Sequence, residues 1–208
     1  MKIIEKTFFT LAIVFLVLVV ILVPLKILLF NEDYYHFQFE KNSVYSKVAN
    51  ADAVLDNLLT FFKGEVELDY FTDNEKSHLE DVSVLLNRFF FVLWFSVIMV
   101  FVSLTTLFFL NKKDFKENVY KVLFLGGLSS FALLILLFLA SINFSLTFGG
   151  FHQIFFPQGN FSFPETSLLI TLFPQAFFRS YMLRMLITSL SLSVVCMAPQ
   201  LILNRLNK

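Results

Sequence analysis

The chain has few of the residues on which most enzyme sites depend: one cysteine (Cys196), three histidines and one tryptophan among 208 residues. A single thiol excludes a disulfide framework within the chain, a paired-thiol metal site and a redox pair. Because Cys196 lies in an apolar stretch, its sequence context favours a buried structural thiol.

Several nucleotide-binding and hydrolase signatures are also missing. The sequence contains no G-x-S-x-G elbow, no Walker loop, no G-x-G-x-x-G and no H-E-x-x-H. Its formal net charge is zero and no basic run is present, so we expect no nucleic-acid partner. The long apolar runs carry almost no charge, which argues against the ion or proton relay of a pump or carrier.

Hydrophobic residues, in contrast, are abundant. They make up 57% of the chain, whereas about 45–50% is typical of soluble globular domains. A bilayer core needs about 20 apolar residues in helical form, and four segments meet this requirement: 8–30, 89–110, 119–141 and 181–203. The sequence therefore predicts an all-α integral membrane protein with a four-transmembrane-helix bundle.

The distribution of lysine and arginine predicts the orientation of this bundle. Lysines cluster in and around the short loop 111–118, and both ends of the chain carry basic residues. The positive-inside rule then places the loop and both termini in the cytoplasm. Segments 31–88 and 142–180 are expected on the outer face.

Segment 31–88 is strongly acidic, with twelve acids and five bases, a net charge of −7. Apolar residues at spacings of three and four predict an amphipathic helix that stops at Gly64. Thr72 and Glu75 match the capping box that opens a helix, and no breaker follows before Phe89. We therefore expect a small extracytoplasmic helical cap that runs directly into the second span.

Segment 142–180 is too aromatic for a solvated loop and too often interrupted by glycine and proline for a span. This pattern is typical of a re-entrant or interfacial segment whose backbone is satisfied by protein. It holds His152, an ionisable residue that is costly near a membrane unless it has a partner or a function.

The other histidines lie in 31–88. His36 follows the first span and is compatible with an interfacial belt position. On the predicted helix, His78 and Asp81 are three residues apart, so they share a face and the carboxylate could orient the imidazole. A solvated surface histidine is the alternative interpretation of His78.

Three motifs carry a resemblance to a known family. "EKSHLEDV" before the second span, "FHQIFF", and "LFPQAFF" before the fourth span resemble the lipoprotein intramolecular transacylase (Lit) family of bacterial membrane proteins. The four spans and the size agree with it. One departure is Phe161, which stands where the family pattern has a tryptophan.

The resemblance implies an acyltransferase of the plasma membrane that moves the sn-2 acyl chain of a diacylglyceryl-modified N-terminal cysteine onto the α-amino group of that cysteine. Since nucleophile and electrophile belong to one substrate, no cofactor, metal or nucleophilic side chain is expected. His152 is the predicted general base, and His78, oriented by Asp81, is the predicted acid or oxyanion stabiliser, although the opposite assignment stays open. Tyr70 is a candidate donor to the oxyanion.

The aromatic segment is the predicted clamp for the acyl chain, and an arginine at the start of the fourth span is a candidate for contact with lipid headgroups. The predicted substrate-binding residues are Phe151, Phe155, Phe156, Phe161 and Arg179. The expected partners are the diacylglyceryl lipoprotein and membrane lipids, and the expected oligomeric state is a monomer.

Two alternatives remain at this level. A metal-dependent membrane hydrolase could use His78, His152 and Asp81 as ligands, and sensitivity to chelators would favour it. A non-enzymatic interaction protein could bind a partner through its acidic outer cap, and tolerance of substitution at both histidines would favour that reading.

Overall fold

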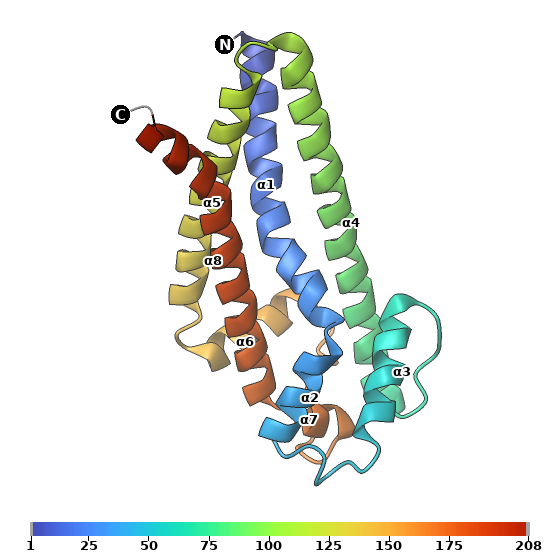
Figure 1. Ribbon diagram of the computed structural model, residues 1–208. Helices are drawn as coiled ribbons and strands as arrows, with labels where there is room; N and C mark the ends of the chain where they lie inside the picture. The colour runs from blue at the N-terminus through green and yellow to red at the C-terminus, as the bar shows by residue number, and fades with distance from the viewer. Residues whose placement is uncertain (1, 207–208) are drawn as a thin grey trace. The chain divides into compact units, whose positions relative to one another are not determined.

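The computed structural model describes residues 2–206, which contain eight α-helices and no strand (Figure 1). The helices are α1 (Ile3–Leu29), α2 (Glu32–Lys41), α3 (Ala51–Lys63), α4 (Asp73–Leu110), α5 (Phe115–Ala140), α6 (Phe144–Phe155), α7 (Leu168–Leu172) and α8 (Gln175–Leu206). Four of them, α1, α4, α5 and α8, are long and apolar enough to cross a membrane. The predicted all-α class with four candidate spans is confirmed.

The chain divides into two compact units. The span unit comprises the residues up to Lys26, Phe89–Ile142 and the residues from Met185 onward. The site unit comprises Ile27–Arg88 and Asn143–Arg184, and it holds all three histidines. Where the bilayer begins and ends on the long helices stays a prediction.

Helix α4 contributes to both units. Its first part, 73–88, belongs to the site unit and carries seven ionisable side chains, whereas 89–110 belongs to the span unit and carries none that is charged. A bilayer core excludes such a density of charge, so the prediction that the membrane-spanning part of α4 begins at Phe89 rests on this change in composition.

Small residues of α5 pack the span unit closely. A Cβ added to Gly127 would lie 2.7 Å from the backbone oxygen of Ser193 in α8, and one added to Gly126 would lie 2.6 Å from Leu16 in α1. Without a hydrophobic driving force between helices in lipid, close approach at small residues is a main source of association. These two glycines therefore let α5 lie directly against α1 and α8.

The site unit has its own hydrophobic core, to which α2, α3, α7 and the first turns of α4 and α8 contribute. Helix α3 buries Val54, Leu55, Leu58 and Leu59 on one face. Gly64 ends α3 in the left-handed conformation at φ 82°, the predicted stop, because glycine adopts this region without a Cβ clash.

The start of α4 is anchored by Glu75, which is only 1% exposed. One carboxylate oxygen accepts hydrogen bonds from the backbone N–H and the hydroxyl of Thr72, at 3.0 and 2.8 Å, and the other accepts from the N–H of Leu169 at 2.9 Å. The predicted capping box is thus confirmed. Glu75 also joins α4 to the beginning of α7, a contact that the local sequence pattern does not contain.

Candidate active site

Two histidines that are distant in the sequence meet in the site unit. The ring centroids of His78 in α4 and His152 in α6 lie 6.1 Å apart, with the rings nearly parallel at 24°. His78 is buried, with 6% of its surface exposed, and His152 is partly exposed. The structure therefore brings together the two imidazoles that the sequence identified separately.

The orientation of His152 is set by its own helix. Its Nδ1 lies 2.7 Å from the carbonyl oxygen of Phe148, one turn earlier in α6. A carbonyl can only accept a hydrogen bond, so Nδ1 carries the hydrogen and donates it. The neutral ring then has its lone pair on Nε2, and the protonated ring has a second N–H there.

Aromatic side chains surround His152. The Phe148 ring lies 4.3 Å away and the Phe161 ring 5.2 Å away, and Phe151 and Phe156 are both at 5.6 Å between centroids. Phe161 thus packs directly on the imidazole.

Phenylalanine also encloses His78. The centroid of the Phe156 ring lies 4.8 Å from that of His78 in a T-shaped arrangement, and the centroid of the Phe163 ring lies 5.5 Å away. Of the four phenylalanines predicted to line the site, Phe151, Phe156 and Phe161 contact His152, and Phe155 packs on Phe151 at 4.7 Å between ring centroids. Sequence reasoning missed Phe148 and Phe163; the i−4 spacing of Phe148 from His152 was the available signal for the first.

The surroundings of His78 disfavour its charged form. Burial is the main cause and the neighbouring His152 adds to it, so that the pKa of His78 falls to about 4, although the charge of Asp81 and the side chain of Asn160 act in the opposite direction. At neutral pH His78 is therefore an uncharged imidazole.

Asp81 does not hold His78 directly. Its Oδ2 accepts hydrogen bonds from the side-chain amides of Gln158 and Asn160, both at 2.6 Å. Among the residues described, no hydrogen bond joins Asp81 to the imidazole. The carboxylate acts on His78 through its charge, while Asn160 contacts both groups. Sequence reasoning missed Gln158 and Asn160, which no spacing rule connects with α4.

Two predicted site residues lie apart from the imidazoles. Tyr70 is 44% exposed, and none of the contacts found in residues 2–206 connects it with either histidine. Arg179 is exposed in the second turn of α8 and likewise shows no contact with the pair. The roles of Tyr70 as an oxyanion donor and of Arg179 as a headgroup contact stay predictions.

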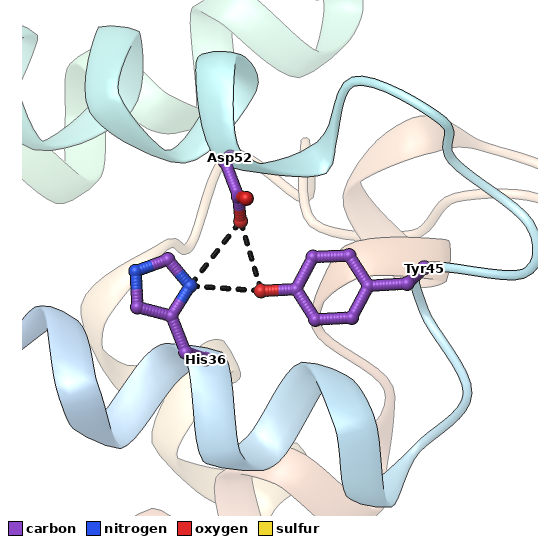
Figure 2. A network of polar contacts seen from close by, with 3 residues as sticks. All are labelled: His36, Tyr45 and Asp52. Carbon is purple, nitrogen blue, oxygen red and sulfur yellow. Dashed lines mark hydrogen bonds and ion pairs between the residues drawn. The ribbon is translucent and has the colours of Figure 1, made fainter.

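The third histidine belongs to a different network (Figure 2). Nδ1 of His36 in α2 lies 2.8 Å from the Tyr45 hydroxyl and 3.2 Å from Asp52 at the start of α3, and the same hydroxyl donates to Asp52 at 2.8 Å. Burial, followed by the hydrogen bond and charge of Asp52, raises the pKa of Tyr45 to about 12. The network ties α2 to α3 and does not involve the other two histidines.

Within the described part of the chain, no group of three or more histidine, cysteine or carboxylate side chains is placed to hold a metal ion. A metal-dependent hydrolase requires such a ligand set. That alternative therefore gains no support from the arrangement of His78, His152 and Asp81.

Solved structures share this fold. The in meso structure of the membrane-integral lipoprotein intramolecular transacylase Lit from Bacillus cereus matches with a TM-score of 0.86 at 17% identity, over 98% of this chain and 97% of that one. Two variants of that protein, with one histidine replaced by arginine or by alanine, match with TM-scores of 0.79 and 0.80 at 16% identity, over 98% of this chain and 95% and 94% of theirs. The fold is thus that of a multi-pass, membrane-integral enzyme.

The sequence itself identifies the family. A model of the lipoprotein intramolecular transacylase family matches residues 9–178, which is most of the chain. The protein belongs to this family: it is an acyltransferase that acts on lipoproteins in the membrane, and the resemblance noted in its three motifs is confirmed. No protein with a curated description matches the chain.

Proposed function

We propose that this transacylase moves the sn-2 acyl chain of a diacylglyceryl-modified lipoprotein to the α-amino group of its N-terminal cysteine. The product is an N-acyl, S-monoacylglyceryl lipoprotein. Membership of the family supports an intramolecular acyl transfer, and the paired imidazoles of His78 and His152 in an aromatic enclosure are the observation that carries the catalytic part of the proposal.

The reaction requires two proton movements. The amine attacks the carbonyl carbon of the ester and forms a C–N bond. The bond between that carbon and the sn-2 oxygen of the glyceryl group then breaks. An α-amino group has a pKa of about 7.7–8.0, so the attacking nitrogen must lose a proton, and the departing alkoxide must gain one. Positioned imidazoles suit both tasks, and each contributes roughly 10²–10⁴-fold in comparable enzymes.

The two imidazoles are not equivalent, and we prefer His78 as the base. A pKa of about 4 leaves His78 uncharged at neutral pH, so it can accept the proton of the amine but has none to give to the leaving oxygen. The low pKa also makes His78 release the accepted proton readily, which resets the site. The sequence predicts His152 as the base and leaves the opposite assignment open; we prefer that opposite assignment.

His152 then protonates the leaving oxygen. With Nδ1–H donating to the carbonyl of Phe148, the protonated ring has its other N–H, on Nε2, available for the oxyanion and the departing alkoxide. The neighbouring His152 disfavours a proton on His78, which keeps His78 available as the base.

The rest of the catalysis is positioning. Holding amine and ester together contributes up to about 7–11 kcal/mol in favourable intramolecular reactions. Phe151, Phe156 and Phe161 pack around the imidazoles and are our candidates for the acyl-chain clamp. Apolar rings around a reacting ester disfavour water there, which would otherwise hydrolyse it.

We further propose that the site faces the outer side of the plasma membrane. The lysines near 111–118 and the basic residues at both ends of the chain support cytoplasmic termini by the positive-inside rule. The acidic segment 31–88, which supplies His78, then lies outside, on the side where lipoproteins carry their diacylglyceryl group.

The direct test is mass spectrometry of an N-terminal lipopeptide from a bacterium that otherwise leaves its lipoproteins in the diacylglyceryl form. Expression of this protein should move one acyl group onto the amine and leave the glycerol with one. His78→Ala and His152→Ala should each abolish the transfer, while the matched control His36→Ala, outside the pair, should retain it.

Two results would count against the proposal. An unchanged lipopeptide despite normal membrane expression would refute the transfer of the acyl chain to the amine. Wild-type conversion by both His78→Ala and His152→Ala would refute acid–base catalysis by the pair. Release of free fatty acid that is blocked by a chelator would instead support the metal-dependent hydrolase.

A further inference from the structure

The contact between Asp81 and Asn160 defines which way the asparagine amide faces. The amide atom 2.6 Å from Oδ2 of Asp81 must be the nitrogen, because a carboxylate accepts hydrogen bonds and cannot donate them. The same nitrogen lies 3.4 Å from the Ser77 hydroxyl. Because Nδ2 donates to α4, the other amide atom of Asn160 is Oδ1, which can only accept a hydrogen bond.

Two buried polar atoms in this region have no hydrogen-bond partner among the described residues: Nδ1 of His78 and Oδ1 of Asn160. One is a potential N–H donor and the other an obligate acceptor. A buried polar atom without a partner is costly, and native proteins rarely keep one without a function. The Asn160 side chain interacts with His78 and favours its protonated form, as an acceptor facing an N–H does.

We propose that Asn160 is a positioning residue for the acyl transfer: in the working enzyme its Oδ1, oriented by Asp81, accepts the hydrogen of His78 Nδ1, a bond that the two atoms do not make in this structure. This inference rests on the proposed function, since it concerns the base of that reaction. The Nδ1–H tautomer places the lone pair of His78 on Nε2, the only ring nitrogen then able to accept the proton of the amine.

The neutral amide explains why Asn160, and not the carboxylate of Asp81, is the neighbour of the imidazole. A carboxylate bonded directly to the imidazole would favour the imidazolium strongly, and a protonated His78 could not act as a base. An amide transmits the orientation from Asp81 without placing a full negative charge on the ring. The chain Asp81–Asn160–His78 thereby fixes the tautomer, while burial and the neighbouring His152 keep the ring neutral.

A purely structural role is the competing explanation, because Asn160 also ties the segment after α6 to α4. The experiment must therefore include a quantity that a structural anchor does not alter. The tautomer of His78 is such a quantity, since ring ¹⁵N chemical shifts distinguish a protonated from an unprotonated nitrogen.

We suggest recording ¹⁵N-histidine spectra of the full-length protein in detergent micelles at neutral pH without substrate, with His78→Gln to assign the signals. The wild-type protein should show His78 protonated at Nδ1 and unprotonated at Nε2. Asn160→Ala should shift His78 toward the other tautomer and lower kcat at least tenfold with a smaller change in KM.

Asp81→Asn keeps the size of the side chain and serves as the second variant. An amide at position 81 can accept or donate, so the Asn160 amide is no longer held one way and His78 should populate both tautomers. Asn57→Ala is the matched control. Asn57 also ties a helix to a loop, bonding the carbonyl of Glu67 and the N–H of Asp69, but it contacts no histidine, so the His78 signals and kcat should not change.

An Nε2–H tautomer in the wild-type protein, or an unchanged tautomer and kcat in folded Asn160→Ala, would overturn the inference. Because the spectra are recorded without substrate, they are independent of where the acyl group goes. A correct tautomer combined with no acyl group on the amine would mean that the proposed function has failed, and with it the role of Asn160 in that reaction.

Discussion

The low pKa of His78 predicts that the site unit loses stability in mild acid. The imidazole titrates near 6.5 in an unfolded chain and at about 4 in the folded protein. Between these values the unfolded state binds more protons than the folded state, so the stability that His78 contributes is fully present above pH 6.5 and decreases as the pH falls toward 4.

The size of the effect follows from the shift. About 2.5 pKa units at 1.36 kcal/mol each give about 3 kcal/mol between pH 6.5 and 4, an order-of-magnitude upper value for one buried group. This is a large part of the stability of a small unit. His78 is 6% exposed, so solvent screening removes little of it.

The assay is hydrogen exchange of the site-unit amides in detergent at pH 7, 5.5 and 4, compared between the wild-type protein and His78→Gln. The glutamine variant cannot titrate, so its protection should decrease less as the pH falls. Glu75 does not confuse the comparison. Burial would raise its pKa, but hydrogen bonds from Leu169, Thr72 and Ser167 outweigh this and lower it, and that contribution is common to both proteins. An equal loss of protection in both proteins would refute a low pKa for His78.

Three further predictions concern stability and activity. Glu75→Gln should lower the free energy of unfolding by about 1–3 kcal/mol, because the buried carboxylate accepts three hydrogen bonds. The same substitution at the exposed Glu65 should not lower it. Thermal unfolding measures both variants, and equal values would contradict the anchor role of Glu75. Gly127→Ala should destabilise by about 1–3 kcal/mol since its Cβ meets backbone, whereas Gly149→Ala has open space and should be neutral; the same melting experiment decides. Tyr45→Phe should change stability by about 1 kcal/mol or less and leave acyl transfer intact, and lost transfer in the lipopeptide assay would assign the Figure 2 network to catalysis.

Much of the fold could be predicted because its signals are local. The four apolar runs, the amphipathic period of α3, the stop at Gly64 and the capping box at Thr72 each depend on residues within one or two turns. Such patterns reflect burial and backbone hydrogen bonding of a single element, and they hold whatever that element packs against.

The site was only partly predictable. His78 and His152 were identified from charge and polarity in apolar surroundings, but their spacing in the chain contains no information on the 6.1 Å between the rings. Helical spacing predicts a direct contact between Asp81 and His78. In the structure the carboxylate of Asp81 instead accepts hydrogen bonds from Gln158 and Asn160. An i, i+3 relation permits a contact, whereas competing donors from another segment decide whether it forms.

The sequence alone therefore determined the class of the protein, its helices, its family and the residue types of its chemistry, because hydropathy, capping and motif residues act over short distances. Only the tertiary structure decided that His78 is uncharged, that Nδ1 of His152 carries its hydrogen, and that the amide of Asn160 lies between Asp81 and His78. Burial and hydrogen-bond geometry arise when α4, α6 and the segment after α6 pack together, and protonation depends on both.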